Sequence, residues 1–221
     1  MSSTSAAKTA GRPSWRPALP VLGLIAATLA GLGLFTWAQR DAFSSVAQKA
    51  ILFEQPRASA PAGALVNEAD ASVAWQAVTG TADGTVIVAQ LDVPETGQRL
   101  TLLFRKNHDT SLPASHIIEV DVAPQRTFPD KAITDVGGLV AKDAPNEAGT
   151  PLSAATARIA DGVFWIGLST TVDEIDRNVR FLTESQFFDL LLTYASGQQV
   201  TLTFEKGRTG RAIFERVLPT W

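Results

Sequence analysis

The sequence has no cysteine among its 221 residues. This absence excludes disulfide bonds, thiolate metal sites and cysteine nucleophiles together. It does not argue against export, because about 180 residues can build a full hydrophobic core without a covalent cross-link.

Acidic residues are missing from the N-terminal part of the chain. No aspartate or glutamate precedes Asp41, whereas Lys8, Arg12 and Arg16 lie in that stretch. Residues 40–221 contain all 22 acidic residues but, with Arg40 included, only 16 of the 19 basic residues, so their net charge is −6. Nucleic acid requires a positively charged footprint, so we expect no nucleic-acid partner.

The sequence also lacks the local signatures of common enzymes. There is no Gly-x-Ser-x-Gly elbow. The turn GTADG at residues 80–84 has neither the lysine nor the following helix of a phosphate-binding loop. Glu119 and Asp121 lie two apart on one strand, and we expect both to face solvent.

Only two histidines occur, His108 and His116. His108-Asp109 lies in a polar loop between strands, not in the long helical hairpin that a phosphoacceptor histidine requires. His116 is expected at the edge of an apolar strand face. The two histidines and the nearby acids do not share one face at metal-ligand spacing. We therefore expect no enzyme activity, no metal and no cofactor.

One long uncharged run stands out among what is present. Residues 18–38 read ALPVLGLIAATLAGLGLFTWA, which as a helix is about 30 Å long, the thickness of the hydrocarbon core. This run predicts a single transmembrane helix in contact with the lipid bilayer. The basic residues before it favour a cytoplasmic N-terminus and a periplasmic C-terminal domain at a bacterial inner membrane. The alternative is a signal cleaved near Ala47, where Ser45-Val46-Ala47 offers small residues at the spacing of a cleavage site.

Small residues recur every four positions within this run, at Gly23, Ala27 and Gly31. Such spacing lets two helix backbones approach closely, so these residues form a candidate helix-dimer face and suggest a homodimer. Small residues are also common in membrane helices that do not dimerise.

The remaining chain divides by composition. Residues 1–17 are expected to be a disordered cytoplasmic tail. Residues 39–71 are expected to be a linker with a first strand at 50–53, and a β-rich extracytoplasmic domain follows at 72–221. The segment 124–150 is turn-rich. Alternating or apolar runs predict strands in this domain at 72–78, 86–93, 99–106, 115–122, 154–159, 163–168, 187–194 and 199–205.

Two short helices complete the prediction. The first follows Thr171, whose spacing to Glu174 matches a capping box, and the second spans 210–218. The pattern is therefore typical of a mainly β domain, either an antiparallel β-sandwich or a partly open barrel with two short helices, preceded by one transmembrane helix.

Five residues are candidate partner contacts. Arg105 and Lys106 form a small basic cluster beside a hairpin, and His108 follows them. Phe164 and Trp165 are adjacent on one strand and face opposite sides, so at least one ring needs cover beyond its own sheet face. Ordinary core packing and a solvated strand face are the alternatives.

Several longer stretches carry a resemblance. RLTLLFRKNHDTSLPASHIIEVDV, GTPL, DGVFWIGLS and DLLLTYASGQQVTLTFEKGRTGRAIFE resemble a group of uncharacterised single-pass membrane proteins of rhizobial type. Some of its members are labelled as chemotaxis-type signal transduction histidine kinases. The order of elements is more distantly similar to the invasion-associated locus B family of exported β-rich proteins. That family implies an envelope location and a non-catalytic role, and its usual cysteine pair is absent here.

The sequence therefore predicts a membrane-anchored envelope protein whose β-rich periplasmic domain binds an envelope protein partner without catalysis. The alternative is a signal-transduction accessory or sensory component. The short N-terminal tail carries no output domain, so this alternative requires a partner kinase.

Overall fold

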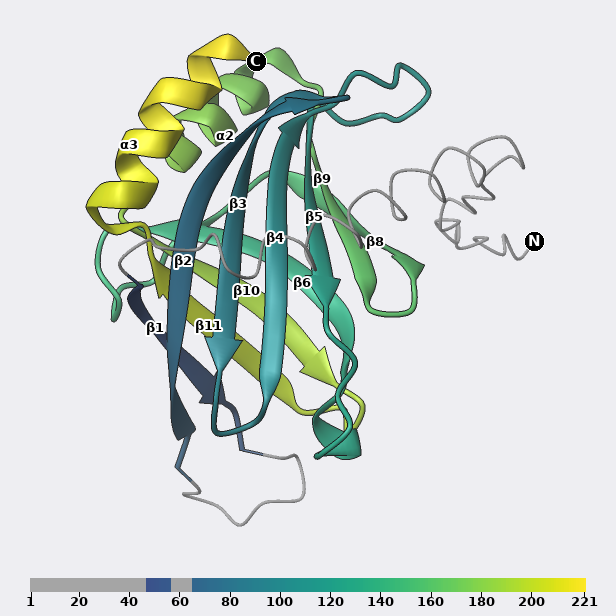
Figure 1. The fold of residues 1–221 in the computed structure, drawn as a ribbon, viewed down its shortest axis with the longest axis vertical. Coiled ribbons are helices and arrows are strands. Elements are labelled where there is room, and N and C mark those ends of the chain that lie inside the picture. Colours follow the sequence, from purple (N-terminus) through teal and green to yellow (C-terminus); the bar gives the residue numbers. More distant parts are fainter. Residues whose placement is uncertain (1–46, 57–64) are drawn as a thin grey trace, which may run out of the picture. The chain divides into compact units, whose positions relative to one another are not determined.

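The computed structural model describes residues 47–56 and 65–221, and these residues form one curled antiparallel sheet (Figure 1). Its eleven strands follow the order β7-β6-β10-β11-β1-β2-β3-β4-β5-β9-β8. They are β1 (Gln48–Glu54), β2 (Asn67–Thr81), β3 (Gly84–Val93), β4 (Gln98–Lys106), β5 (His116–Val122), β6 (Ile133–Lys142), β7 (Thr150–Pro151), β8 (Ala154–Ala160), β9 (Val163–Leu168), β10 (Phe187–Tyr194) and β11 (Gln199–Glu205).

The sheet curls into a half-barrel, because its two ends turn toward each other. β6 approaches β8 and β9, although these strands do not pair as a ladder. The amide of Leu152, which follows β7, donates to the carbonyl of Leu139 at 2.9 Å and continues the pairing of β7 with β6 up to the start of β8. A mainly β fold with a partly open barrel is thus confirmed. A single continuous sheet replaces the two sheets of the sandwich alternative.

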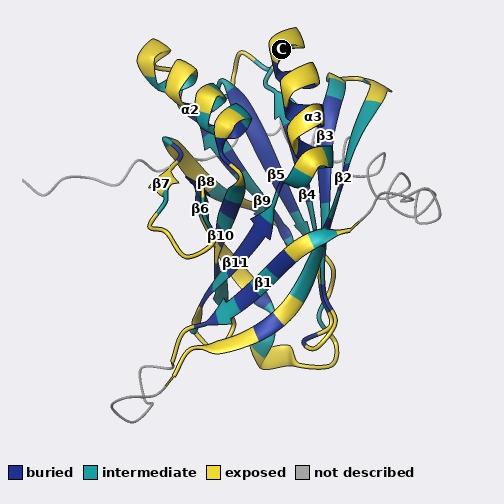
Figure 2. Cartoon of the chain, turned by 90° about the vertical axis from the view of Figure 1, so that its left-hand side faces the viewer, coloured by how far each residue is buried: buried dark blue, intermediate teal, exposed yellow. Residues whose placement is uncertain are grey.

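Two helices cover one end of the concave face: α2 (Val172–Glu184) and α3 (Gly207–Val217) (Figures 1 and 2). Short 3-10 turns lie at Pro129–Lys131 and Leu218–Thr220. Lys206, which is 1% exposed, joins the two helices because its Nζ donates to the carbonyls of Leu182 and Thr183 at 2.7 and 2.8 Å. These carbonyls belong to the last turn of α2, where a helix leaves acceptors unsatisfied.

The core lies inside the curl and is rich in aromatic rings. Trp75 of β2 contacts Phe104, Phe204 and Phe214, with ring centroids 5.4 to 6.0 Å apart. Its Nε1 donates to the carbonyl of Glu205 at 3.0 Å, so one side chain spans from β2 to the end of β11. Each fully buried side chain of this size contributes about 1.5–3 kcal/mol. Helix α3 is therefore packed into the concave face through Phe214.

Three sequence expectations about local structure are wrong. The segment 124–150, expected to be turn-rich, contains the ten-residue strand β6. The alternation of buried and exposed residues along β6 is interrupted at Gly137 and Gly138, where its register against β10 shifts. Strand β2 begins at Asn67, inside the expected linker, and β1 lies between β2 and β11 in the middle of the sheet. Thr171 precedes α2 but makes no side-chain cap hydrogen bond. Glu174 bonds Ser169 and Ser153 instead, which lowers the pKa of its carboxyl.

The expected cytoplasmic tail, the transmembrane helix at 18–38 and its candidate dimer face lie outside the described residues, as do Ser45 and Val46 of the candidate cleavage motif. Within the described ranges, no helix is long and apolar enough to cross a membrane.

Candidate functional site

The candidate site is a cluster of four side chains that contact one another on the convex face and the adjoining turn. Glu119 of β5 and Trp165 of β9 are directly paired residues, and Trp165 Nε1 donates to Glu119 Oε2 at 2.7 Å. The guanidinium of Arg105 lies over the Trp165 ring, 5.6 Å from its centroid. Arg105 Nη1 is 3.6 Å from Asp83 Oδ1 in the β2–β3 turn. We call Asp83, Arg105, Glu119 and Trp165 the convex cluster.

Strand pairing explains why these residues meet. Phe104 and Phe164 point into the core, so Arg105 and Trp165, their neighbours in the chain, point to the opposite face. The register then places Leu103 of β4 beside Glu119, and Glu119 beside Trp165. The acidic side chain is therefore held between an aliphatic side chain and an indole.

Glu119 is buried although it faces away from the core. It is 5% exposed, and burial raises the pKa of its carboxyl, while the Trp165 hydrogen bond and the charge of Arg105 oppose that rise. Asp121 on the same face is partly buried, and burial also raises its pKa. The expectation that Glu119 faces solvent is wrong, because Glu119 is buried between Leu103 and Trp165, its partners in the two flanking strands.

The five candidate contact residues fall into different environments. Arg105 and Trp165 meet in the convex cluster. Phe164 is 1% exposed and belongs to the core. Lys106 pairs with His116 at the end of β4, on the face that Phe104 also occupies. His108 is exposed in the loop that follows.

That loop is ordered by Asn107. Its Nδ2 lies 3.0, 3.2 and 2.7 Å from the carbonyls of Asp109, Leu112 and Ala114, so one side chain holds the loop closed. Ser111 donates from both its amide and its hydroxyl to Asp109, and these bonds lower the pKa of the Asp109 carboxyl.

Glu119 and Asp83 are the members of the cluster that sequence reasoning missed. Glu119 lies in a strand whose residues alternate between apolar and polar. This alternation is the same whether the acidic side chain is exposed to solvent or buried. Asp83 lies in a turn whose position relative to β4 depends on long-range pairing. An acid inside the run HIIEVDV, with apolar residues on both sides, was the available signal.

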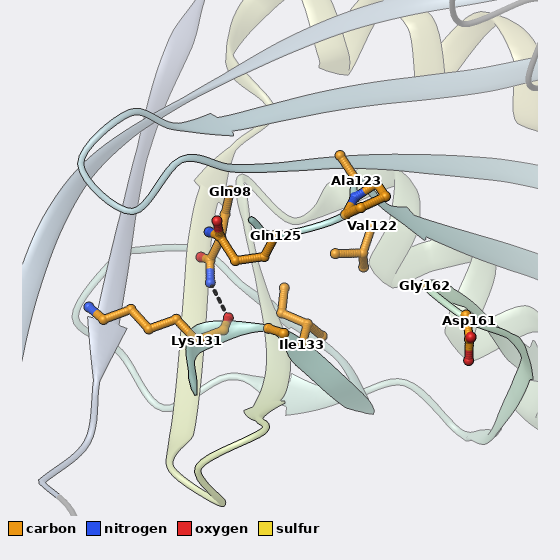
Figure 3. A pocket seen from close by; sticks show the side chains of 10 residues that line it. Gln98, Val122, Ala123, Gln125, Lys131, Ile133, Asp161 and Gly162 are labelled. Atoms are coloured by element: carbon orange, nitrogen blue, oxygen red, sulfur yellow. Dashed lines mark hydrogen bonds between the residues drawn. The ribbon is translucent and has the colours of Figure 1, made fainter. Parts of the chain in front are cut away.

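A second polar cluster lies at the other end of the half-barrel, next to a pocket of about 180 Å³ (Figure 3). Lys131 Nζ is 2.7 Å from Glu54 Oε1, and Gln98 Nε2 donates to the carbonyl of Lys131 at 2.9 Å. Tyr194 lies with its hydroxyl 3.1 Å from Glu54 Oε1 and 3.3 Å from Gln98 Oε1, and burial raises its pKa.

The polar groups at this pocket already bind one another. Gln125 Nε2 donates to the carbonyl of Thr96, and Gln125 Oε1 accepts from the amide of Thr127. Figure 3 shows Gln98 and Gln125 at one side of the pocket and Asp161 at the other. This cluster therefore closes the end of the half-barrel, and its internal pairing satisfies the buried charge of Glu54.

The convex cluster combines one cation, one aromatic ring and two carboxylates. It presents a cation stacked on an aromatic ring, a geometry that strengthens when a partner removes water. Among the described residues, no group of three or more histidine, aspartate or glutamate side chains is arranged to hold a metal ion. The chain matches no family model, no curated protein and no solved structure.

Proposed function

We propose that this chain is a single-pass envelope protein of the bacterial inner membrane, whose β-rich periplasmic domain binds a protein partner without catalysis. The uncharged run at 18–38 and the basic residues before it support the anchor and its direction. The convex cluster supports the binding role. The resemblance to the invasion-associated locus B family implies an envelope location and a non-catalytic role, which is consistent with this proposal.

The observation that carries the binding role is the stacking of Arg105 on Trp165 beside a buried carboxylate. Helix α3 and its aromatic contacts occupy the concave face, whereas Arg105 and Trp165 on the convex face are both partly exposed. Arginine and tryptophan are enriched among the residues that dominate protein interfaces. The indole is held in place by Glu119, so it loses little side-chain freedom when a partner binds.

Topology is tested with two reporters fused after Trp221. Alkaline phosphatase becomes active only outside the cytoplasm, whereas green fluorescent protein exported in the unfolded state does not fluoresce. The proposal requires phosphatase activity without fluorescence. Fluorescence without phosphatase activity would contradict it.

Partner binding is tested by covalent cross-linking of intact cells, followed by purification of the full chain and quantitative mass spectrometry. We expect one envelope protein to be depleted by at least about tenfold in Arg105→Ala, since a hot-spot residue contributes more than about 1.4 kcal/mol. Arg177→Ala is the matched control, because Arg177 lies on the exposed side of α2 and its charge pairs only loosely with Glu174 at 3.6 Å. Equal recovery of every protein with both variants would remove the binding proposal.

A further inference from the structure

Helix α3 presents an arginine-rich face to solvent. Its buried residues all lie on the side that packs against the sheet: Gly210, Ile213, Phe214 and Val217. Its exposed residues share the opposite side, which Figure 2 shows in yellow: Arg208, Arg211, Ala212, Glu215 and Arg216. Three arginines and one glutamate give α3 a charge of +2, whereas residues 40–221 together carry −6.

These three arginines have no acidic partner among the described residues. No carboxylate of that part of the chain lies within ion-pair distance of them, although Glu215 is on the same face. Other exposed arginines do have one: Nη2 of Arg158 lies 2.7 Å from Oδ1 of Asp161, and Nη2 of Arg177 lies 3.6 Å from Oε1 of Glu174. The arginine face of α3 is therefore available to an anionic partner.

The chain enters the domain beside this helix. Gln48, the first residue of β1, lies so close to Gly207, the first residue of α3, that a Cβ at Gly207 would clash with its side chain. The next residue, Lys49, is exposed and adds a positive charge. Nine residues, 39–47, connect this point to the expected membrane helix at 18–38, and they span at most about 30 Å. A domain tethered in this way has α3 within reach of the bilayer surface.

We propose that the exposed face of α3 binds anionic phospholipid headgroups of the bilayer that holds the anchor, and that this contact sets how the domain stands on the membrane. The inference rests on the anchor of the proposed function. A guanidinium binds a phosphate through two parallel hydrogen bonds. Each basic residue near an anionic bilayer adds to an attraction that falls off within a Debye length.

The tether favours a bilayer over an acidic protein as the partner. A short connection keeps the arginine face at a high effective concentration relative to lipid, whether or not a protein partner is present. The rest of the domain is acidic, so an anionic surface repels its other sides and favours the side that carries the arginines.

The test uses the full chain in vesicles whose lipids include some with a nitroxide quencher on the headgroup. The absence of native cysteine permits one fluorophore at Ala212→Cys, on the exposed face of α3. We expect stronger quenching in vesicles that contain phosphatidylglycerol than in pure phosphatidylcholine. The difference should shrink when salt is raised from about 0.1 M to about 1 M, because the Debye length falls from about 10 Å to about 3 Å.

A second label position controls for the orientation of the domain. Thr127 is exposed, and its amide bonds Gln125 beside the pocket at the other end of the half-barrel. A fluorophore at Thr127→Cys should not be quenched more strongly by anionic vesicles than by neutral ones.

Two double variants test the arginines directly. Arg208→Gln with Arg211→Gln should lower the equilibrium constant for docking on anionic vesicles about 25-fold, or about fivefold for each arginine. Arg99→Gln with Arg126→Gln is the matched control, because it removes the same charge from exposed positions at the other end of the half-barrel. The control should leave quenching at Ala212 unchanged, and thermal unfolding of both double variants checks that the fold is retained.

Equal quenching at Ala212 in neutral and anionic vesicles, or equal losses in the two double variants, would overturn the proposal. A label that responds to a soluble acidic polypeptide but not to anionic lipid would assign the face to a protein and would overturn it as well. Failure of the full chain to float with phosphatidylcholine vesicles would contradict the anchor instead. In that case, flotation with phosphatidylglycerol vesicles that the Arg208 and Arg211 variant loses would still support lipid binding by α3, and no such flotation would overturn it.

Discussion

The indole of Trp165 and the carboxylate of Glu119 are joined by a 2.7 Å hydrogen bond between neighbouring strands. This bond satisfies one oxygen of an acid that is 5% exposed, and it fixes the ring on which Arg105 stacks. The ring that we propose as a partner contact is therefore oriented by a buried carboxylate.

Trp165→Phe should destabilise the domain by about 1–3 kcal/mol, since it leaves a buried carboxylate without its donor. In a Glu119→Gln background the same change should cost less, because a neutral amide loses less when its partner is removed. Urea denaturation of the two single variants and the double variant measures this difference. Equal costs in both backgrounds would show that the hydrogen bond is not what holds the ring.

His116 should make stability fall in mild acid. Burial and the nearby charge of Lys106 lower the pKa of His116 to about 4. Between pH 6.5 and 4 the unfolded chain therefore binds a proton that the folded chain excludes, and the free energy of unfolding drops by up to about 3 kcal/mol as pH falls. His116→Gln should flatten this part of the profile.

The matched control for that experiment is His108→Gln, because His108 is exposed in its loop. Subtracting each variant's profile from that of the unchanged protein cancels the contributions of Glu119 and Asp121. A pH dependence that His116→Gln leaves unaltered would contradict the assignment.

Lys206 should make stability rise with pH in alkali, which is the same direction as the effect of His116 in mild acid. Burial lowers its pKa to about 8, so between pH 8 and 10.5 the unfolded chain binds more protons than the folded one, and stability rises with pH. The increase by pH 9.5 should be about 2 kcal/mol. The measurement ends at pH 9.5, below the ordinary pKa of tyrosine, so the titration of Tyr194 does not contribute to the measured rise. Calorimetry of Lys206→Met should show no such rise, and a persisting rise would assign it to another group.

Lys142 and Asp189 form a buried ion pair at 2.8 Å, and Thr203 Oγ1 donates to the same carboxylate at 2.6 Å. Lys142→Met should cost about 3–5 kcal/mol, because it leaves the aspartate charge without its cation. The double variant Lys142→Met with Asp189→Leu should recover most of that loss in chemical denaturation. A double variant no more stable than the single one would show that the pair is needed for packing and not for charge balance.

Period-two alternation predicted most strands because one face of each lies against the core, as in 163–168, where Phe164 and Ile166 are buried. It failed at β6 because Gly137 and Gly138 coincide with a register shift, which moves Leu139 back to the inner face. Local patterns also missed the capping of α2. Glu174 bonds Ser153, which precedes β8, and that contact depends on how the helix lies against the sheet.

In the convex cluster, too, the local sequence indicated individual residues but not the contacts between them. Arg105 and Trp165 were accessible to sequence reasoning as a charge beside a hairpin and an aromatic ring needing cover. The contact between Arg105 and Trp165 could not be predicted, because β4 and β9 are separated by β5 in the sheet and by about 60 residues in the chain. Glu119 completes the site from that middle strand, and only the pairing order brings the three together.

The central claim is that the convex cluster is the partner-binding surface, and a photo-cross-linking amino acid tests it most directly. Thr101 of β4 lies on the convex face near the cluster, and Thr201 of β11 is a partly buried threonine on the same face of a distant strand. With the full chain in intact cells, the account predicts a discrete cross-linked envelope protein from position 101, absent from position 201 and lost with Arg105→Ala. A cross-link from position 201 alone, or one from position 101 that survives Arg105→Ala undiminished, would contradict it.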